Sequence, residues 1–106
     1  MTSLVPYMEA VEYRIINKLV RKAIKDDYLI DVFDGEEWTV KLSNEPSSIL
    51  LAMATTGQDV IRLRRDGKSA GIISFVYNGD ADVICDHSDN AAINALVSHA
   101  MKGIAA

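Results

Sequence analysis

The segment that most constrains the fold is residues 28–42, whose pattern predicts a β-hairpin. Two apolar-rich runs flank a short acidic loop, and Asp34-Gly35 is a typical pair for the bend of a hairpin. In the second run Trp38, Val40 and Leu42 alternate with polar residues, so one face of this strand is expected to be apolar. A lone hairpin is only marginally stable in water, so the rest of the chain must cover it.

A long helix is predicted before the hairpin. Apolar residues recur at three- and four-residue steps from Leu4 to Ile24, which is the pattern of an amphipathic helix. Ser3 is expected to be its N-cap, and Pro6 falls in the first turn, where a missing N–H has no consequence. The acidic pair that starts at Asp26 opposes the helix dipole and therefore predicts the end of the helix.

Two shorter helices are predicted further along the chain. The first is expected after Ser43 or Asn44, with Gly57 as its left-handed terminator. The second lies near the C-terminus and is expected to have Asp86 or Ser88 as its N-cap. Both have an apolar stripe, so each should pack that side against the sheet.

Three more strands are predicted between these two helices, at residues 60–65, 69–77 and 82–86. Asp66-Gly67 between the first two is a strong hairpin signal. The middle strand is apolar on both faces, so it is expected in the interior of the sheet. Gly71 within this strand indicates a bulge or a close approach of another segment.

The predicted elements follow in the order α-β-β-α-β-β-β-α, and a chain of 106 residues is expected to form one domain, residues 1–106. Short links between strands favour antiparallel pairing. The predicted fold is therefore α+β, an antiparallel sheet of about five strands covered mainly on one face by helices. The expected core residues are Val11, Ile15, Leu19, Val32, Trp38, Val40, Ile72, Phe75, Leu96 and Val97.

Composition excludes several classes of protein. A hydrophobic content of 49% with 25% charged residues is typical of a globular chain rather than a disordered one. Cys85 is the only cysteine, so no internal disulfide can form. Charges interrupt the N-terminal apolar positions, and no apolar run approaches the roughly 20 residues that span a bilayer. We therefore expect an intracellular protein with no membrane contact.

Several segments resemble small proteins carried by bacterial phages and prophages. They are the hairpin sequence 32–41, the short helix after it, the arginine-rich strand with Asp66-Gly67, and the late sequence Asp86-His-Ser-Asp-Asn90. The resemblance runs from the hairpin to the start of the last helix. It implies an accessory protein in the cytoplasm of a bacterial host. The resemblance further implies that the protein binds and inhibits a host factor, for example a CRISPR-like defence component. The resemblance brings no catalytic motif.

The acidic hairpin loop is the first candidate for a binding surface. A projecting turn with carboxylates and Trp38 at its base is typical of an anchor in a protein interface. The alternative places Trp38 in the core and leaves the carboxylates as solvated turn residues. The candidate contact residues for a protein partner are Asp34, Glu36, Glu37, Asp80 and Asp82.

The basic side chains are the second candidate surface. Those of the long helix recur at three- to four-residue intervals and should share one face, while two arginines share one side of a strand. Together these groups could hold the phosphates of a nucleic acid, although the net charge of the chain is −4 and no known reading motif is present. The alternative is a solvated face with local ion pairs. The residues concerned are Arg14, Lys18, Arg21, Lys25, Arg62 and Arg64.

Metal, cofactor and catalytic sites are not expected. The acidic run at residues 78–89 has Val83-Ile84 where an EF-hand needs ligands and lacks the closing glutamate. No phosphate-binding glycine loop is present. Cys85 lies among apolar residues and is expected to be a small core residue, and His99 has no evident carboxylate to orient it.

Three functions therefore follow from the sequence, in order of preference. The first is a non-enzymatic protein that binds a host protein through a charged surface. The second is a small nucleic-acid-binding regulator that uses the basic helix face. The third, a small enzyme, requires a pocket that collects Cys85, Asp86 and His87. Homodimerisation through a sheet edge or the first helix is compatible with each of them.

Overall fold

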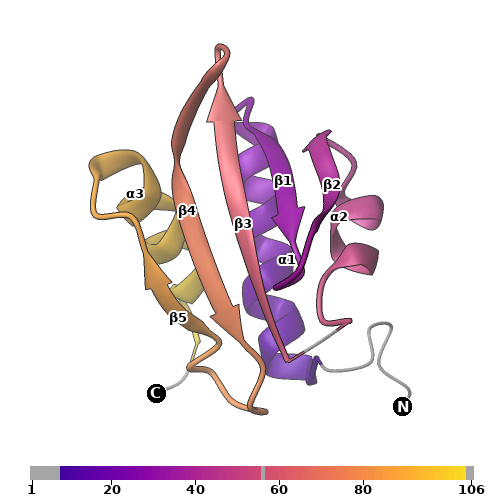
Figure 1. Ribbon diagram of the computed structural model, residues 1–106. Coiled ribbons are helices and arrows are strands. Elements are labelled where there is room, and N and C mark those ends of the chain that lie inside the picture. Colours follow the sequence, from indigo (N-terminus) through magenta and orange to yellow (C-terminus); the bar gives the residue numbers. More distant parts are fainter. Residues whose placement is uncertain (1–7, 56, 105–106) are drawn as a thin grey trace.

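A computed structural model describes residues 8–55 and 57–104 of the chain. Over these residues the chain forms a five-stranded antiparallel sheet and three helices in the predicted order (Figure 1). The elements are α1 (Ala10–Lys25), β1 (Leu29–Phe33), β2 (Trp38–Ser43), α2 (Pro46–Ala52), β3 (Gln58–Arg65), β4 (Lys68–Val76), β5 (Ile84–His87) and α3 (Ala91–Met101).

The strands are arranged in the order β2-β1-β3-β4-β5, and every neighbouring pair is antiparallel. β4 lies inside the sheet, as its two apolar faces predict. Asp66 and Gly67 join β3 to β4 with φ angles of +56° and +76°, the conformation of the tight hairpin turn that this pair favours. The hairpin prediction is confirmed here and at β1–β2.

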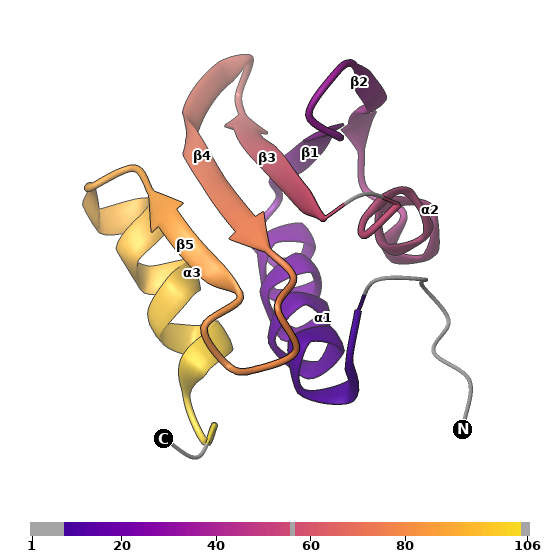
Figure 2. The same cartoon turned by 60° about the horizontal axis from the view of Figure 1, so that its bottom comes forward.

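The helices cover one face of the sheet. α1 and α3 lie side by side behind the strands, and α2 packs against α1, β1 and β2 (Figures 1 and 2). Alternate residues of the central strands point into this layer, for example Ile61 and Leu63 of β3 and Ile73 and Phe75 of β4, all fully buried. No element of the described chain covers the other face, and that face carries the remaining alternate residues.

The start of α1 differs from the prediction. Met8 and Glu9 are not helical and Glu9 is the N-cap, while Ser3 and Pro6 lie outside the described residues. A capping box fixes the start, because Glu12 accepts from the backbone N–H of Glu9 at 2.8 Å. The end of α1 near Asp26 is as predicted.

The ends of the two shorter helices also differ. Gly57 does not terminate α2; Ala54 adopts the left-handed conformation instead, with φ +58°, and donates its N–H to the carboxylate of Asp59. The N-cap of α3 is Asn90, whose side chain accepts from the N–H of Ile93. Neither residue expected as the N-cap caps this helix. Asp86 belongs to β5, and the hydroxyl of Ser88 accepts from the backbone N–H of Ile72.

Two expected core residues lie outside the core. Trp38 is half-buried on the uncovered face, and Ile72 is 43% exposed there. The alternation expected for β2 is also broken, because its register with β1 shifts on both sides of Val32 and Leu42 takes a φ of +50° with its side chain 55% exposed. Val11, Val40 and Val97 are partly buried against the core, and the other expected core residues are fully or almost fully buried.

Gly71 fulfils both parts of its prediction. The register between β3 and β4 shifts beside it, which marks a bulge. A Cβ atom at this position would lie 2.7 Å from Cγ1 of Ile93 and 2.8 Å from Oγ of Ser88.

Within the described part of the chain, no helix is long and apolar enough to cross a membrane.

Candidate functional site

The two acidic loops of the sheet lie at the same end of the molecule. β1 and β4 run in the same direction, so the β1–β2 turn and the β4–β5 loop both follow the lower ends of these strands in Figure 1. The α2–β3 connection lies at this end as well. These three connecting segments, residues 34–37, 53–55 with 57, and 77–83, contain five acidic residues and no lysine or arginine. We call this region the acidic end.

The turn residue Asp34 has a structural task within the acidic end. Its Oδ1 accepts the backbone N–H groups of Glu37 and Glu36, each at 2.9 Å, and these hydrogen bonds hold the pKa of Asp34 below its ordinary value. The carboxylates of Glu36 and Glu37 are exposed and make no hydrogen bond or ion pair with another described residue. They are the charges that this turn offers to a partner.

The second loop is built in a similar way. Asp80 accepts the backbone N–H of Asp82 at 2.9 Å, and both residues are exposed. The loop is tied to α1 by Glu12, a buried carboxylate whose Oε2 accepts the N–H groups of Asn78 and Gly79 at 3.0 and 3.1 Å. The position of this loop is therefore fixed by α1.

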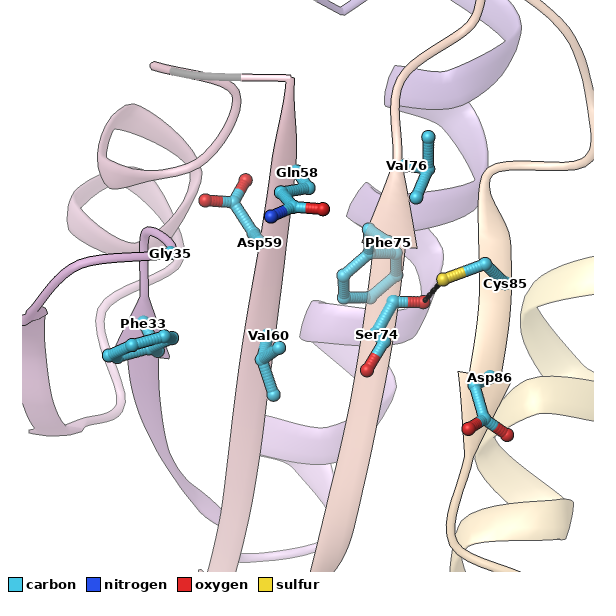
Figure 3. Close-up of a pocket in the computed structure, with 10 residues that line it drawn as sticks. All are labelled: Phe33, Gly35, Gln58, Asp59, Val60, Ser74, Phe75, Val76, Cys85 and Asp86. Carbon is cyan, nitrogen blue, oxygen red and sulfur yellow. Dashed lines mark hydrogen bonds between the residues drawn. The ribbon is translucent and has the colours of Figure 1, made fainter.

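A shallow hollow of about 380 Å³ lies on the uncovered face beside the acidic end (Figure 3). Phe33, Val60 and Ser74 line it from three adjacent strands, and Asp86 lines it from β5. An apolar surface with carboxylates at its border suits a long basic side chain, whose aliphatic stem and charged head need both kinds of neighbour. The full set of lining residues is Phe33, Gly35, Gln58, Asp59, Val60, Ser74, Phe75, Val76, Cys85 and Asp86.

Asp59 is a buried carboxylate at the border of this hollow. Its Oδ2 accepts the N–H of Ala54 at 2.7 Å and the hydroxyl of Tyr77, while its Oδ1 is buried and has no partner among the described residues. Loss of solvation raises the pKa of Asp59, and the charge of Asp34 adds to that effect. The same burial, together with the negative charge of Asp59, raises the pKa of Tyr77.

The structure divides the expected nucleic-acid surface into two parts. Arg14, Arg21 and Lys25 are exposed on α1, and the Nζ of Lys18 donates to the C-cap carbonyl of α3. α1 lies behind the sheet, whereas the strand arginines alternate with buried residues and therefore point to the opposite, uncovered face. The two sets therefore lie on opposite sides of the molecule and do not form one continuous surface.

The strand arginines, Arg62 and Arg64, instead form a cluster that sequence reasoning missed. Each donates Nε–H to the same oxygen of buried Asp31, at 2.8 and 2.9 Å. The guanidinium of Arg62 lies 4.1 Å from the ring centroid of Trp38, which contacts Phe33 with ring centroids 5.1 Å apart. We call Asp31, Phe33, Trp38, Arg62 and Arg64 the arginine–aromatic cluster.

A signal for this cluster was present in the sequence. Asp31 and Phe33 are two positions apart and share a strand face, and so do Arg62 and Arg64. The missing information was the pairing of β1 with β3, which places Asp31 opposite Arg62. Burial alone would raise the pKa of Asp31, but its hydrogen bonds with Leu42, Arg62 and Arg64 outweigh that effect and lower it.

The residues considered for catalysis lie on β5 and α3. Cys85 is exposed rather than buried, because β5 is an edge strand whose register shifts beside Ser74, and its thiol contacts the carbonyl of Ser74 at 3.5 Å. Cys85, Asp86 and His87 line a second shallow hollow, but the ring Nδ1 of His87 is paired with the carbonyl of Ser88. His99 is exposed on α3. No group of three or more His, Cys, Asp or Glu in the described chain could hold a metal ion.

Comparison of the chain with protein-family models, with curated proteins and with solved structures gives no match. The resemblance to phage and prophage proteins therefore stays a prediction.

Proposed function

We propose that this protein is a non-enzymatic binding protein whose acidic end docks on a positively charged surface of a host protein. The observation that supports this most directly is the placement of two acidic loops, far apart in sequence, at one end of the sheet with no basic residue in the connecting segments there. A one-sign surface of this kind attracts a basic partner and repels acidic ones.

The charges and the hollow have different tasks in this proposal. Exposed carboxylates such as Glu36, Glu37 and Asp80 raise the association rate and select the partner. Affinity requires a desolvated centre, and the hollow lined by Phe33 and Val60 offers one for a basic side chain of the partner. Asp86 would pair with its charged head.

The resemblance to phage and prophage proteins narrows the class of partner that we propose. We infer an accessory protein that acts in the bacterial cytoplasm and inhibits a host factor, with a CRISPR-like defence component as the leading class. Proteins that handle nucleic acid carry basic surfaces, which a carboxylate-rich end complements.

Affinity purification from a nuclease-treated bacterial lysate, followed by mass spectrometry, tests the proposal. The tagged protein should retain a protein partner, and the Glu36→Lys/Glu37→Lys variant should lose it because both reversed charges face the partner. The Glu45→Lys/Asp89→Lys variant is the matched control, since it changes net charge equally at exposed positions outside the two acidic loops. Equal retention by the two variants, or no partner for the wild-type protein, contradicts the proposal.

A further inference from the structure

We propose a second binding site, on the uncovered face of the sheet, at which the arginine–aromatic cluster binds single-stranded nucleic acid. A base would stack on the layer formed by Arg62 and Trp38, and the neighbouring phosphates would bind Arg62 and Arg64. This site uses none of the carboxylates of the acidic end, although Phe33 and Val60 border both regions.

The first support is the pair of neighbouring aromatic rings, Phe33 and Trp38, with a guanidinium over one of them. Trp38 and Phe33 face one another across β1 and β2, and the guanidinium of Arg62 covers the Trp38 ring at 4.1 Å. Both aromatic residues are half-buried, so each keeps an exposed side. Unpaired bases stack on aromatic rings and on arginine planes, and such stacking tolerates any base.

The second support is the charge balance of the cluster. Two guanidinium groups share the single carboxylate of Asp31, so the group carries an excess positive charge. Each arginine uses Nε for Asp31, and the terminal nitrogens have no partner among the described residues. The side chains of Arg62 and Arg64 are 29% and 32% exposed, which leaves those nitrogens within reach of a ligand. Because Asp31 already orients both side chains, little conformational entropy is lost on binding.

The third support is the apolar surface beside the cluster. Ile72 lies opposite Arg62 on β4 and is 43% exposed, and Val60 lies opposite Phe33 on β3. An acidic peptide would pair with the arginines but would gain nothing from the exposed aromatic rings. A single strand supplies phosphates and flat faces at regular intervals. A duplex hides its base faces within the stack, which favours single strands.

The acidic end limits how far a bound strand can extend. Phosphates are repelled by Asp86 and by the acidic hairpin turn, which lie at the β4–β5 and β1–β2 ends of the face. Lys68 is exposed at the opposite end, in the β3–β4 hairpin. The site therefore takes a short segment of a few nucleotides that lies toward this hairpin.

Fluorescence of the single tryptophan gives a direct test, because Trp38 belongs to the proposed site. Oligo-dT and oligo-U added at low salt should quench the emission. If two phosphates are contacted, the logarithm of the association constant should fall with the logarithm of salt concentration with a slope of about −1.4. Fluorescence anisotropy with a labelled oligonucleotide measures the affinity of variants. Arg62→Gln/Arg64→Gln should weaken binding at least tenfold. Trp38→Leu should also weaken binding, whereas Trp38→Phe should keep most of the wild-type affinity.

The matched control is Arg14→Gln/Arg21→Gln on α1, which removes the same charge from the covered side of the molecule and should bind as the wild type does. Circular dichroism confirms that each variant is folded. The proposal is overturned by absent quenching at low salt, by equal weakening in the α1 variant, or by equal affinity for duplex DNA. It is also overturned if oligo-glutamate quenches Trp38 equally, or if protein concentration alone quenches it, which would mean that a second copy covers the face.

Discussion

The hydroxyl of Tyr77 donates its hydrogen bond to the same oxygen of Asp59 that already accepts from the backbone of Ala54. The second oxygen of Asp59 is left buried without a partner in the described chain. A charged carboxylate in this position is costly, and its raised pKa expresses that cost.

We expect Asp59→Asn to change how stability depends on pH. A raised pKa means that the folded state binds this proton more tightly than the unfolded state does. Between the ordinary value of 3.8 and the raised value, the free energy of unfolding of the wild type should therefore fall as pH rises, and above that window the penalty is complete. The asparagine side chain of the variant does not titrate. The wild type should therefore gain stability relative to the variant as pH is lowered from about 7 to about 4. Urea unfolding at a series of pH values measures it.

Tyr77→Phe should destabilise the protein by about 1.5–3 kcal/mol at neutral pH, because it removes a hydrogen bond to a buried charge. The loss should shrink at acid pH, where Asp59 is protonated. Thermal or urea unfolding at two pH values tests this. The prediction is wrong if the loss is the same at both, and Tyr13→Phe, a partly buried tyrosine on α1, is the control.

Asp31→Asn should change the pH dependence of stability in the opposite direction to Asp59→Asn. The lowered pKa of Asp31 means that its stabilising effect is complete above the ordinary value of 3.8 and is lost as pH falls toward the folded pKa. At neutral pH the substitution should cost about 1–3 kcal/mol, because two partly exposed arginines lose their shared partner. The difference from the wild type, measured by urea unfolding, should narrow at acid pH. Asp89→Asn, at an exposed position, should show neither effect.

Gly71→Ala should be among the most damaging single changes in the chain. The added methyl group would lie under 3 Å from Ile93 and Ser88, at a φ of +148°, so α3 must move away from β4. We expect a loss of roughly 2–4 kcal/mol. Gly57→Ala is the control, because nothing lies within 4 Å of its new Cβ and its φ is ordinary, so its effect should stay within about 0.5 kcal/mol. Thermal unfolding compares the two.

Glu12→Gln should loosen the β4–β5 loop. The carboxylate of Glu12 accepts two loop N–H groups and one at the start of α1, and an amide can present only one oxygen to them. Hydrogen exchange at the amides of Asn78 and Gly79 should accelerate, with a stability loss of about 1–3 kcal/mol. Glu45→Gln, at an exposed position, should leave these amides unchanged. Unaltered exchange at Asn78 in the Glu12 variant would contradict this role.

Local chemistry explains why much of the fold was predictable. The Asp66-Gly67 turn, the bulge at Gly71 and the alternation of β3 depend on neighbours in sequence, and all three appear as expected. The end of α1 is equally local. Such features need no knowledge of what the rest of the chain does.

The errors share a different cause, since each depends on contacts beyond the helix or strand in which the residue lies. Trp38 and Ile72 looked like core residues because periodicity reports alternation but not which face the helices cover. Ala54 can hold a left-handed conformation in place of Gly57 because the carboxylate of Asp59 accepts its N–H. The arginine–aromatic cluster required the register of β1 with β3, which no local pattern contains.

The irregular course of β2 has a consequence for the behaviour of the protein in concentrated solution. Its register with β1 shifts, and Leu42 takes a left-handed conformation. The N–H of Leu42 also donates to the side chain of Asp31. These features interrupt the regular row of backbone hydrogen-bonding groups that another strand would need. The opposite edge, β5, is only four residues long. Because one border is irregular and the other is short, we expect both to be poor templates for edge-to-edge growth and amyloid-like aggregation, even though one side of the sheet is open.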